Sequence, residues 1–119
     1  MGLLYEAEAK EISIGELLAT LELPLDEYAH TLVTGAAAQL EEIDAQLERF
    51  AEGWSVARMP ALDRAILRLA SFELGHSSDI PVAVILNEAV ELAKTYSTKS
   101  SGGFINGVLS KVAAATRSE

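Results

Sequence analysis

The sequence predicts an all-α domain, a compact bundle of about six to seven helices. Apolar residues recur at spacings of three and four along most of the chain, and no segment alternates apolar and polar residues over a useful length. Half of the 119 residues are apolar, which is enough for one hydrophobic core. Residues 1–119 are therefore expected to form a single domain, without internal repeats or a dividing linker.

Four helices are expected in the first half of the chain. They are a two-turn helix over residues 3–8, a helix capped by Ser13 and stopped by Pro24, a helix capped by Asp26, and a helix from Leu40 that Gly53 ends. In the third, Tyr28 and Leu32 should face inward. In the fourth, Glu41, Asp44 and Glu48 should face away from the core, as on a packed surface helix.

Three helices with marked starts are expected in the second half. Pro60 suits the first turn of one helix, Pro81 opens the next, and the loop at 97–103 leads into the last. Arg64, Arg68 and Ser71 should lie on the open side of the first. The predicted buried stripes are Leu62, Ile66, Leu69 and Ala70, then Ile85, Leu86, Ala89, Leu92, Ala93 and Tyr96, and finally Phe104 or Ile105 with Val108, Leu109 and Val112.

Composition excludes several classes of function. The chain has no cysteine, so disulfides and zinc–thiolate sites are ruled out, and His30 and His76 have no metal-ligand spacing around them. No apolar run approaches the ~20 residues of a membrane span, and no basic start precedes an apolar stretch as in a signal peptide. Catalytic signatures such as GxSxG are absent. We expect a cytoplasmic protein that is not an enzyme and needs no cofactor.

The net charge of −9 arises in the first half of the chain. Residues 1–60 carry 12 acidic and 3 basic side chains, whereas residues 61–119 carry 6 of each. A phosphate-binding surface needs clustered cations. Any contact with nucleic acid is therefore expected in the second half.

The loop before the last helix has two interpretations. Its glycines leave backbone N–H groups open to an anion, and Lys99 could add charge. From spacing alone, a flexible connection with Ser100 or Ser101 as a cap is favoured. Phe104, just inside the helix, could stack on an unpaired base, although an aromatic at this place more often belongs to the core. Glycine inside a helix costs about 1 kcal/mol relative to alanine, so close approach of another helix is expected at Gly107.

A charged group begins the helix after Pro60. Asp63 lies in the first turn, where a carboxylate interacts favourably with the helix dipole. Beside it, Arg64 and Arg68 are one turn apart on the open side. The three are predicted to form either a solvated face or a partner-binding patch whose charges are not neutralised within the chain.

Three fixed words carry a family resemblance. DRAILRLASFEL, NEAVELAK and GGFINGVL, in this order and at close spacing, resemble the C-terminal half of the NusB family of all-helical bacterial antitermination factors. LLYEAE at residues 3–8 is similar to the end of the family's first helix, and residues 26–52 fit its middle pair. Agreement is strongest from Trp54 to Val112, and GWSVARMPALDRAILR looks closest to actinobacterial members.

The resemblance implies a role in transcription antitermination or ribosomal RNA synthesis. Such a factor would pair with the ribosomal protein NusE and bind single-stranded RNA of the boxA type, with a homodimer as a further arrangement. By resemblance, Phe104 would contact RNA, Ser100 would lie in the RNA-facing loop, and Asp63 would lie on the NusE-facing surface. The implied RNA-binding residues are Tyr5, Lys99, Ser100 and Phe104, and the implied partner-binding residues are Asp63, Arg64 and Arg68.

The sequence departs from the family pattern in two places. The family's arginine-rich segment ahead of LLYEAE is absent from this sequence, which begins at Met1, and Gly103 stands where the family often has lysine. Both differences remove cations, so this form is expected to bind RNA weakly. Two alternatives therefore stay open. One is a NusB-like interaction scaffold without RNA binding, and the other is a detached NusB-like RNA-recognition domain of an RNA cytosine methyltransferase.

Overall fold

The computed structural model describes residues 5, 8–9, 27–51, 55–96 and 101–117. These residues form five α-helices and one 3-10 turn, without a strand among them, which confirms the predicted all-α class. The elements are α3 (Glu27–Ala38), α4 (Leu40–Phe50), η1 (Val56–Arg58), α5 (Ala61–His76), α6 (Val82–Tyr96) and α7 (Ser101–Thr116). No described helix has the length and apolarity that crossing a membrane would require.

Several predicted boundaries lie outside the described residues. They are the helix capped by Ser13 and stopped by Pro24, the cap at Asp26 and the helix end at Gly53. Within the described part, Tyr5, Glu8 and Ala9 are helical, and α4 ends at Phe50. Pro60 precedes α5 as its N-cap residue, and the carbonyl of Pro81 accepts the first hydrogen bonds of α6. The two prolines therefore start helices as predicted.

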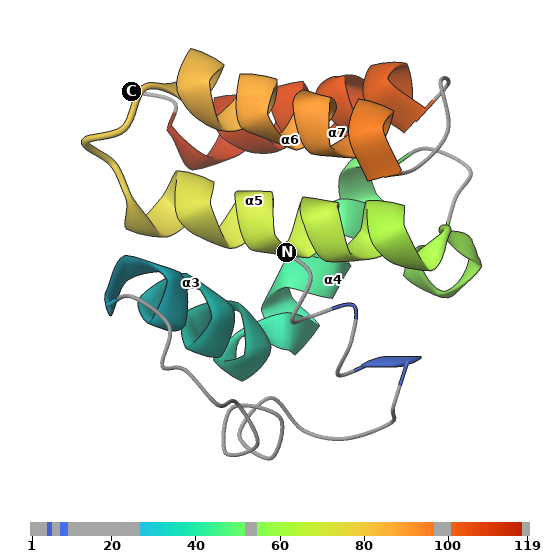
Figure 1. Cartoon of the computed structure of the whole chain (residues 1–119), viewed down its shortest axis with the longest axis horizontal. Helices are drawn as coiled ribbons and strands as arrows, with labels where there is room; N and C mark the ends of the chain where they lie inside the picture. The colour runs from blue at the N-terminus through green and yellow to red at the C-terminus, as the bar shows by residue number, and fades with distance from the viewer. Residues whose placement is uncertain (1–4, 6–7, 10–26, 52–54, 97–100, 118–119) are drawn as a thin grey trace.

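Helix α5 lies at the centre of the fold. It packs against α3 on one side and the α6–α7 pair on the other, and α4 crosses it (Figure 1). Eight of its sixteen residues are buried, and they include the polar Asp63 and Ser71. A surface helix buries one stripe, whereas α5 is buried around most of its circumference. The predicted open side at Ser71 is therefore wrong, because residues of α4 and α7 border this position.

The two last helices pair with each other and supply half of the buried apolar residues outside α5. In α7, the predicted stripe of Ile105, Val108, Leu109 and Val112 is fully buried, which confirms it. In α6, Tyr96 is 59% exposed, so its assignment to the buried stripe is wrong. Tyr96 is the last residue of α6, where the helix reaches the surface. The rest of the predicted α6 stripe is buried or partly buried, with Ile85, Ala89 and Ala93 innermost and Leu86 and Leu92 packed against the core.

Tyr28 was also predicted to face inward, but it is 43% exposed. Its hydroxyl donates a hydrogen bond to Glu73 Oε2 at 2.7 Å and lies 2.7 Å from Ser77 Oγ. Burial, together with the hydrogen bond and charge of Glu73, raises the pKa of Tyr28 above its ordinary value. The polar end of the ring therefore keeps Tyr28 at the edge between α3 and α5.

The close helix approach occurs at Gly35 and not at Gly107. A Cβ atom on Gly35 would lie 2.7 Å from Cε2 of Phe72, whose ring is buried and stacked on His76. Gly107 has no atom within 4 Å of such a position, so the approach predicted there is wrong. The absence of a side chain at Gly35 is what lets α3 pack against α5.

Arg117 binds backbone carbonyls at the C-terminal end of α5. Its Nε donates to the carbonyl of Leu74 at 2.9 Å, and its terminal nitrogens donate to the carbonyls of Ser77 and Ile80. The last carbonyls of a helix have no partners within the helix, and a cation near them is favourable. Arg117 therefore ties the end of α7 to the connection between α5 and α6.

Replacing Gly35 with alanine is expected to lower the free energy of unfolding by about 1–2 kcal/mol, because the ring of Phe72 must shift in a packed core. Gly107→Ala is the matched control, since it adds the same methyl group to open space. It should raise stability by up to about 1 kcal/mol through helix propensity. Urea denaturation measures both, and equal stabilisation by the two changes would contradict the close approach.

Arg117→Ala is expected to lower the free energy of unfolding by about 2 kcal/mol, because three carbonyls lose a charged donor. Arg117→Lys keeps the charge without the planar fork and should recover less than half of the loss. Thermal denaturation of the three proteins provides the comparison. Full recovery with lysine would mean that only the charge at the helix end matters.

Candidate nucleic-acid and protein interface

The turn before α5 is held by the side chain of Arg64. Its Nη1 donates to the carbonyls of Val56 at 2.9 Å and Met59 at 3.1 Å, and it lies 3.5 Å from the carbonyl of Ala57. These carbonyls belong to η1 and the residue that follows it, and that of Val56 also accepts from the backbone N–H of Met59 at 3.2 Å. Arg64 therefore fixes η1 against the first turns of α5.

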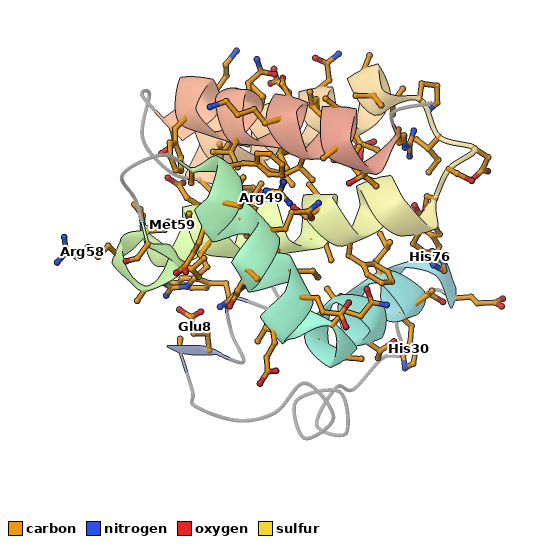
Figure 2. All side chains as sticks on the ribbon, turned by 180° about the vertical axis from the view of Figure 1, so that it is seen from behind. Glu8, His30, Arg49, Arg58, Met59 and His76 are labelled. Carbon is orange, nitrogen blue, oxygen red and sulfur yellow. The ribbon has the colours of Figure 1, made fainter. Side chains whose placement is uncertain are left out.

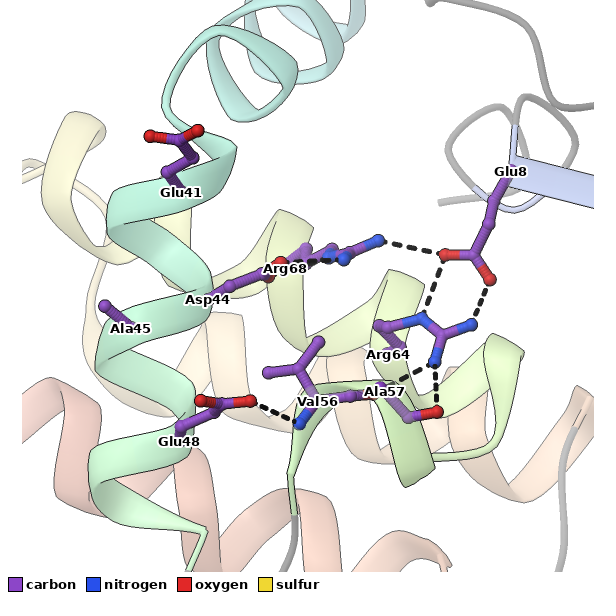
Figure 3. Close-up of a pocket in the computed structure, with 9 residues that line it drawn as sticks. All are labelled: Glu8, Glu41, Asp44, Ala45, Glu48, Val56, Ala57, Arg64 and Arg68. Atoms are coloured by element: carbon purple, nitrogen blue, oxygen red, sulfur yellow. Dashed lines mark hydrogen bonds and ion pairs between the residues drawn. The ribbon is translucent and has the colours of Figure 1, made fainter.

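Arg64 and Arg68 also share a carboxylate from the start of the chain. Glu8 accepts from Nε of Arg64 at 2.9 Å and from Nη1 of Arg68 at 3.0 Å, and it forms a second bond with Arg64 (Figure 3). Asp44 on α4 binds Arg68 through two parallel hydrogen bonds of 2.9 and 2.8 Å. Each arginine side chain is only 14% exposed. The prediction that these charges are not neutralised within the chain is wrong.

The ion pairs change the acid–base properties of their members. Hydrogen bonding from Arg64, together with the charges of Arg64 and Arg68, holds the pKa of Glu8 below its ordinary value, although burial opposes this. A carboxyl group with a lowered pKa in the folded state stabilises the fold at every pH above its pKa in the unfolded chain. This contribution is lost as the pH falls through the lowered pKa. The network therefore favours attachment of Glu8 to α5 at neutral pH.

A groove of about 720 Å³ surrounds this network (Figure 3). Its lining combines four carboxylates with two guanidinium groups, so the lining is net negative. Glu48 accepts a hydrogen bond from the backbone N–H of Val56 at 2.9 Å, and Glu41 lies exposed about two helical turns earlier on α4. The residues are Glu8, Glu41, Asp44, Ala45, Glu48, Val56, Ala57, Arg64 and Arg68. Such a surface repels phosphate and suits a partner segment with basic side chains.

Asp63 does not belong to this charged surface. It is 2% exposed, and one of its carboxyl oxygens accepts a hydrogen bond of 2.9 Å from Oγ of Ser101, which is 4% exposed. Neighbouring residues of an α-helix project about 100° apart. Arg64 therefore points toward Glu8, while Asp63 points toward the first residue of α7. The prediction that Asp63 lies beside the arginines on the open side is wrong.

The start of α7 holds the remaining described candidate. Phe104 is half-buried and packs against the core, whereas the next residue, Ile105, is fully buried. Gly103 is exposed, and Tyr5, the candidate from the start of the chain, is 38% exposed. Lys99 and Ser100 lie outside the described residues. Among the predicted residues, the structure brings Arg64 and Arg68 together, and it joins Asp63 to the helix that carries Phe104.

The cations of the described residues divide into two kinds. Arg64, Arg68 and Arg117 are used within the chain, as described above. Arg49, Arg58, Lys94 and Lys111 are exposed, although Lys94 lies 3.9 Å from Glu91 and the guanidinium of Arg49 lies over the ring of Phe50. Arg58, the last residue of η1, extends away from the molecule (Figure 2). Among the described residues no cluster of histidine and acidic side chains could hold a metal ion, and His30 and His76 lie at the opposite end from Glu8 (Figure 2).

Sequence reasoning missed the two carboxylates that pair with the arginines. Glu8 lies 56 positions from Arg64, and Asp44 lies 24 positions from Arg68. The available signal was the spacing of four between the arginines, which places both on one face next to an acidic helix. That spacing does not identify which acidic side chains reach them.

The chain is similar to known proteins over nearly its whole length. The NusB family model matches residues 3–114. The transcription antitermination protein NusB of Lysinibacillus sphaericus is 43% identical over 109 residues, which cover 91% of this chain and 86% of that protein. The protein of the same name from Acidothermus cellulolyticus is 46% identical over 118 residues, with 96% of this chain and 81% of that protein covered.

Solved structures agree with these relatives. The structure of T. maritima NusB superposes with a TM-score of 0.85 and 35% sequence identity. The alignment covers 94% of this chain and 83% of the T. maritima chain. A crystal structure of antitermination factors NusB and NusE in complex with double-stranded RNA has a TM-score of 0.81 and 30% identity, over 95% of this chain and 89% of that chain. From the family match, the sequence identity and the shared fold together, this chain belongs to the NusB family.

Proposed function

We propose that this chain is a transcription antitermination factor that pairs with ribosomal protein NusE and binds boxA-type single-stranded RNA. The observation that carries the proposal is its similarity, over 91–96% of its length, to relatives that are transcription antitermination proteins. A structural neighbour with the same fold is a NusB bound to NusE and RNA. Such a factor would act during transcription, in the cytoplasm.

The relatives favour this function over the two alternatives. They are NusB proteins of which this chain covers 81–86%, whereas a detached methyltransferase domain would match only the front of larger enzymes. A scaffold without RNA binding is not favoured, because a solved structure with this fold is a NusB bound to NusE and RNA. Our proposal requires no cofactor.

We place the RNA surface at the start of α7. Phe104 is only half-buried although it borders the core, so part of its ring can stack on a base. The sequence adds Lys99 and Ser100 just before it. Tyr5 is exposed and completes the proposed set. Stacking, rather than phosphate contact, is expected to supply most of the affinity, because the cations of α5 are already paired.

We place the protein surface at the groove lined by Arg64 and Arg68. Its net negative lining favours a basic segment of the partner. Hydrogen bonds to Glu8 and Asp44 hold the two arginine side chains in place in the groove. Asp63 is buried and does not line this groove.

Phe104→Ala is expected to weaken binding of a boxA-type RNA roughly 5- to 150-fold, which corresponds to about 1–3 kcal/mol of lost stacking. Its stability should fall by less than about 2 kcal/mol, below the loss for a fully buried phenylalanine. Fluorescence anisotropy with a labelled single-stranded RNA at low salt measures the affinity, and urea denaturation measures the stability.

Phe50→Ala is the matched control, because Phe50 is also partly buried against the core and lies on α4. It should lower stability to a similar extent without changing the RNA affinity. Equal losses of RNA affinity in the two variants would mean that Phe104 acts only through the core.

Glu41→Lys is expected to weaken NusE binding roughly 5- to 10-fold, because it reverses a charge in a groove proposed to receive basic side chains. Glu42→Lys is the matched control, since Glu42 is equally acidic and exposed but borders a different surface. Isothermal titration calorimetry gives both affinities. The same loss for both variants would assign the effect to overall charge and remove the groove from the interface.

A further inference from the structure

We propose that Asp63 is a positioning residue for RNA binding, acting through its hydrogen bond with Ser101 to hold the first turn of α7 and the ring of Phe104 in place. The inference rests on the proposed function, and it assigns Asp63 a role apart from the partner surface. Ser101 is the first residue of α7, and Phe104 lies one turn further on the same side of the helix.

The hydrogen bond is placed where its loss has a large effect. Oγ of Ser101 lies 2.9 Å from Oδ2 of Asp63, and both side chains are almost completely buried. When a buried polar group loses its hydrogen-bond partner, no water replaces the partner, and the free-energy cost of removing the group from water is no longer offset. The carboxyl group lies in the first turn of α5 and reaches the first residue of α7, so it interacts favourably with the N-terminal ends of both helices.

The start of α7 needs such an anchor because its sequence is a poor helix former. Gly102 and Gly103 occupy its first turn and Gly107 its second, and each glycine costs about 1 kcal/mol relative to alanine. A Cβ atom on Gly103 would have no atom within 4 Å, so packing does not require glycine there. On Gly102 it would make an ordinary contact of 3.5 Å with Val90. The first turn is therefore weak by itself and relies on the contact of Ser101.

The rest of α7 does not depend on this contact. Ile105, Leu109 and Val112 are fully buried in the core and hold the helix from the second turn onward. Loss of the anchor should therefore fray the first turn while the domain stays folded. Phe104, at the boundary between the anchored turn and the core-held part, would lose its fixed orientation.

The test uses the full chain, with Ser101→Ala to remove the donor and Asp63→Asn to retain an acceptor. We expect Ser101→Ala to increase amide hydrogen exchange at residues 105–107 roughly 5- to 30-fold, without RNA present. Its affinity for a labelled boxA-type single-stranded RNA should fall by a similar factor. Asp63→Asn should keep most of both properties, because its side-chain carbonyl can still accept from Ser101.

A rescue separates positioning from general stability. Adding Gly103→Ala to Ser101→Ala should restore RNA affinity to within about threefold of Gly103→Ala alone, because alanine strengthens the first turn directly. Gly107→Ala is the matched control, since it adds the same methyl group to equally open space in the second turn. It should raise global stability without restoring affinity.

The outcomes divide cleanly. Unchanged exchange and RNA affinity in Ser101→Ala would overturn the inference, and so would equal rescue by Gly103→Ala and Gly107→Ala. If the unsubstituted chain binds no RNA at all, the proposed function fails. In that case, faster exchange in Ser101→Ala would still establish the anchor, and unchanged exchange would remove it too.

Discussion

The burial of α5 is the constraint on which the rest of the structure depends. A polar side chain that a helix carries into the interior costs free energy unless it finds a hydrogen-bond partner. On α5, Oγ of Ser71 is buried without such a partner, whereas three other side chains have one: Asp63 accepts from Ser101, Arg64 binds the carbonyls of η1, and Arg68 binds Asp44. Each of these contacts attaches a different element to α5. The polar residues of the central helix therefore determine how α4, α7 and the turn before α5 are held.

Two adjacent residues at the start of α5 separate the two proposed surfaces. Asp63 and Arg64 are neighbours in sequence, yet they point to α7 and to Glu8 respectively. The partner groove and the RNA-facing turn thus share one helical turn as their common support. A change in that turn would be felt at both surfaces, whereas a change at Glu41 or Phe104 would be felt at one. This distinction follows from the geometry of a helix and requires no movement of the domain.

The sequence allowed the helices among the described residues, the family and the buried stripe of α7 to be predicted, because each depends on local periodicity or on fixed motifs. It did not allow burial around α5 to be predicted, because that depends on how many helices surround it. For this reason Asp63 and Ser71 were expected on the open side of α5, although both are buried. The same limit applies to glycine: Gly35 and Gly107 have the same cost in a helix, and only the position of Phe72 distinguishes them.

The internal use of arginine also sets the physical character of RNA binding. The chain has a net charge of −9, and Arg64 and Arg68 cannot contact phosphate without losing Glu8 or Asp44. Each phosphate contact with single-stranded nucleic acid adds roughly −0.7 to the slope of log affinity against log salt. With the arginines of α5 paired, neither adds to this slope. At the surface proposed at the start of α7, stacking on one ring would then carry more of the affinity, and the orientation of that ring would be decisive.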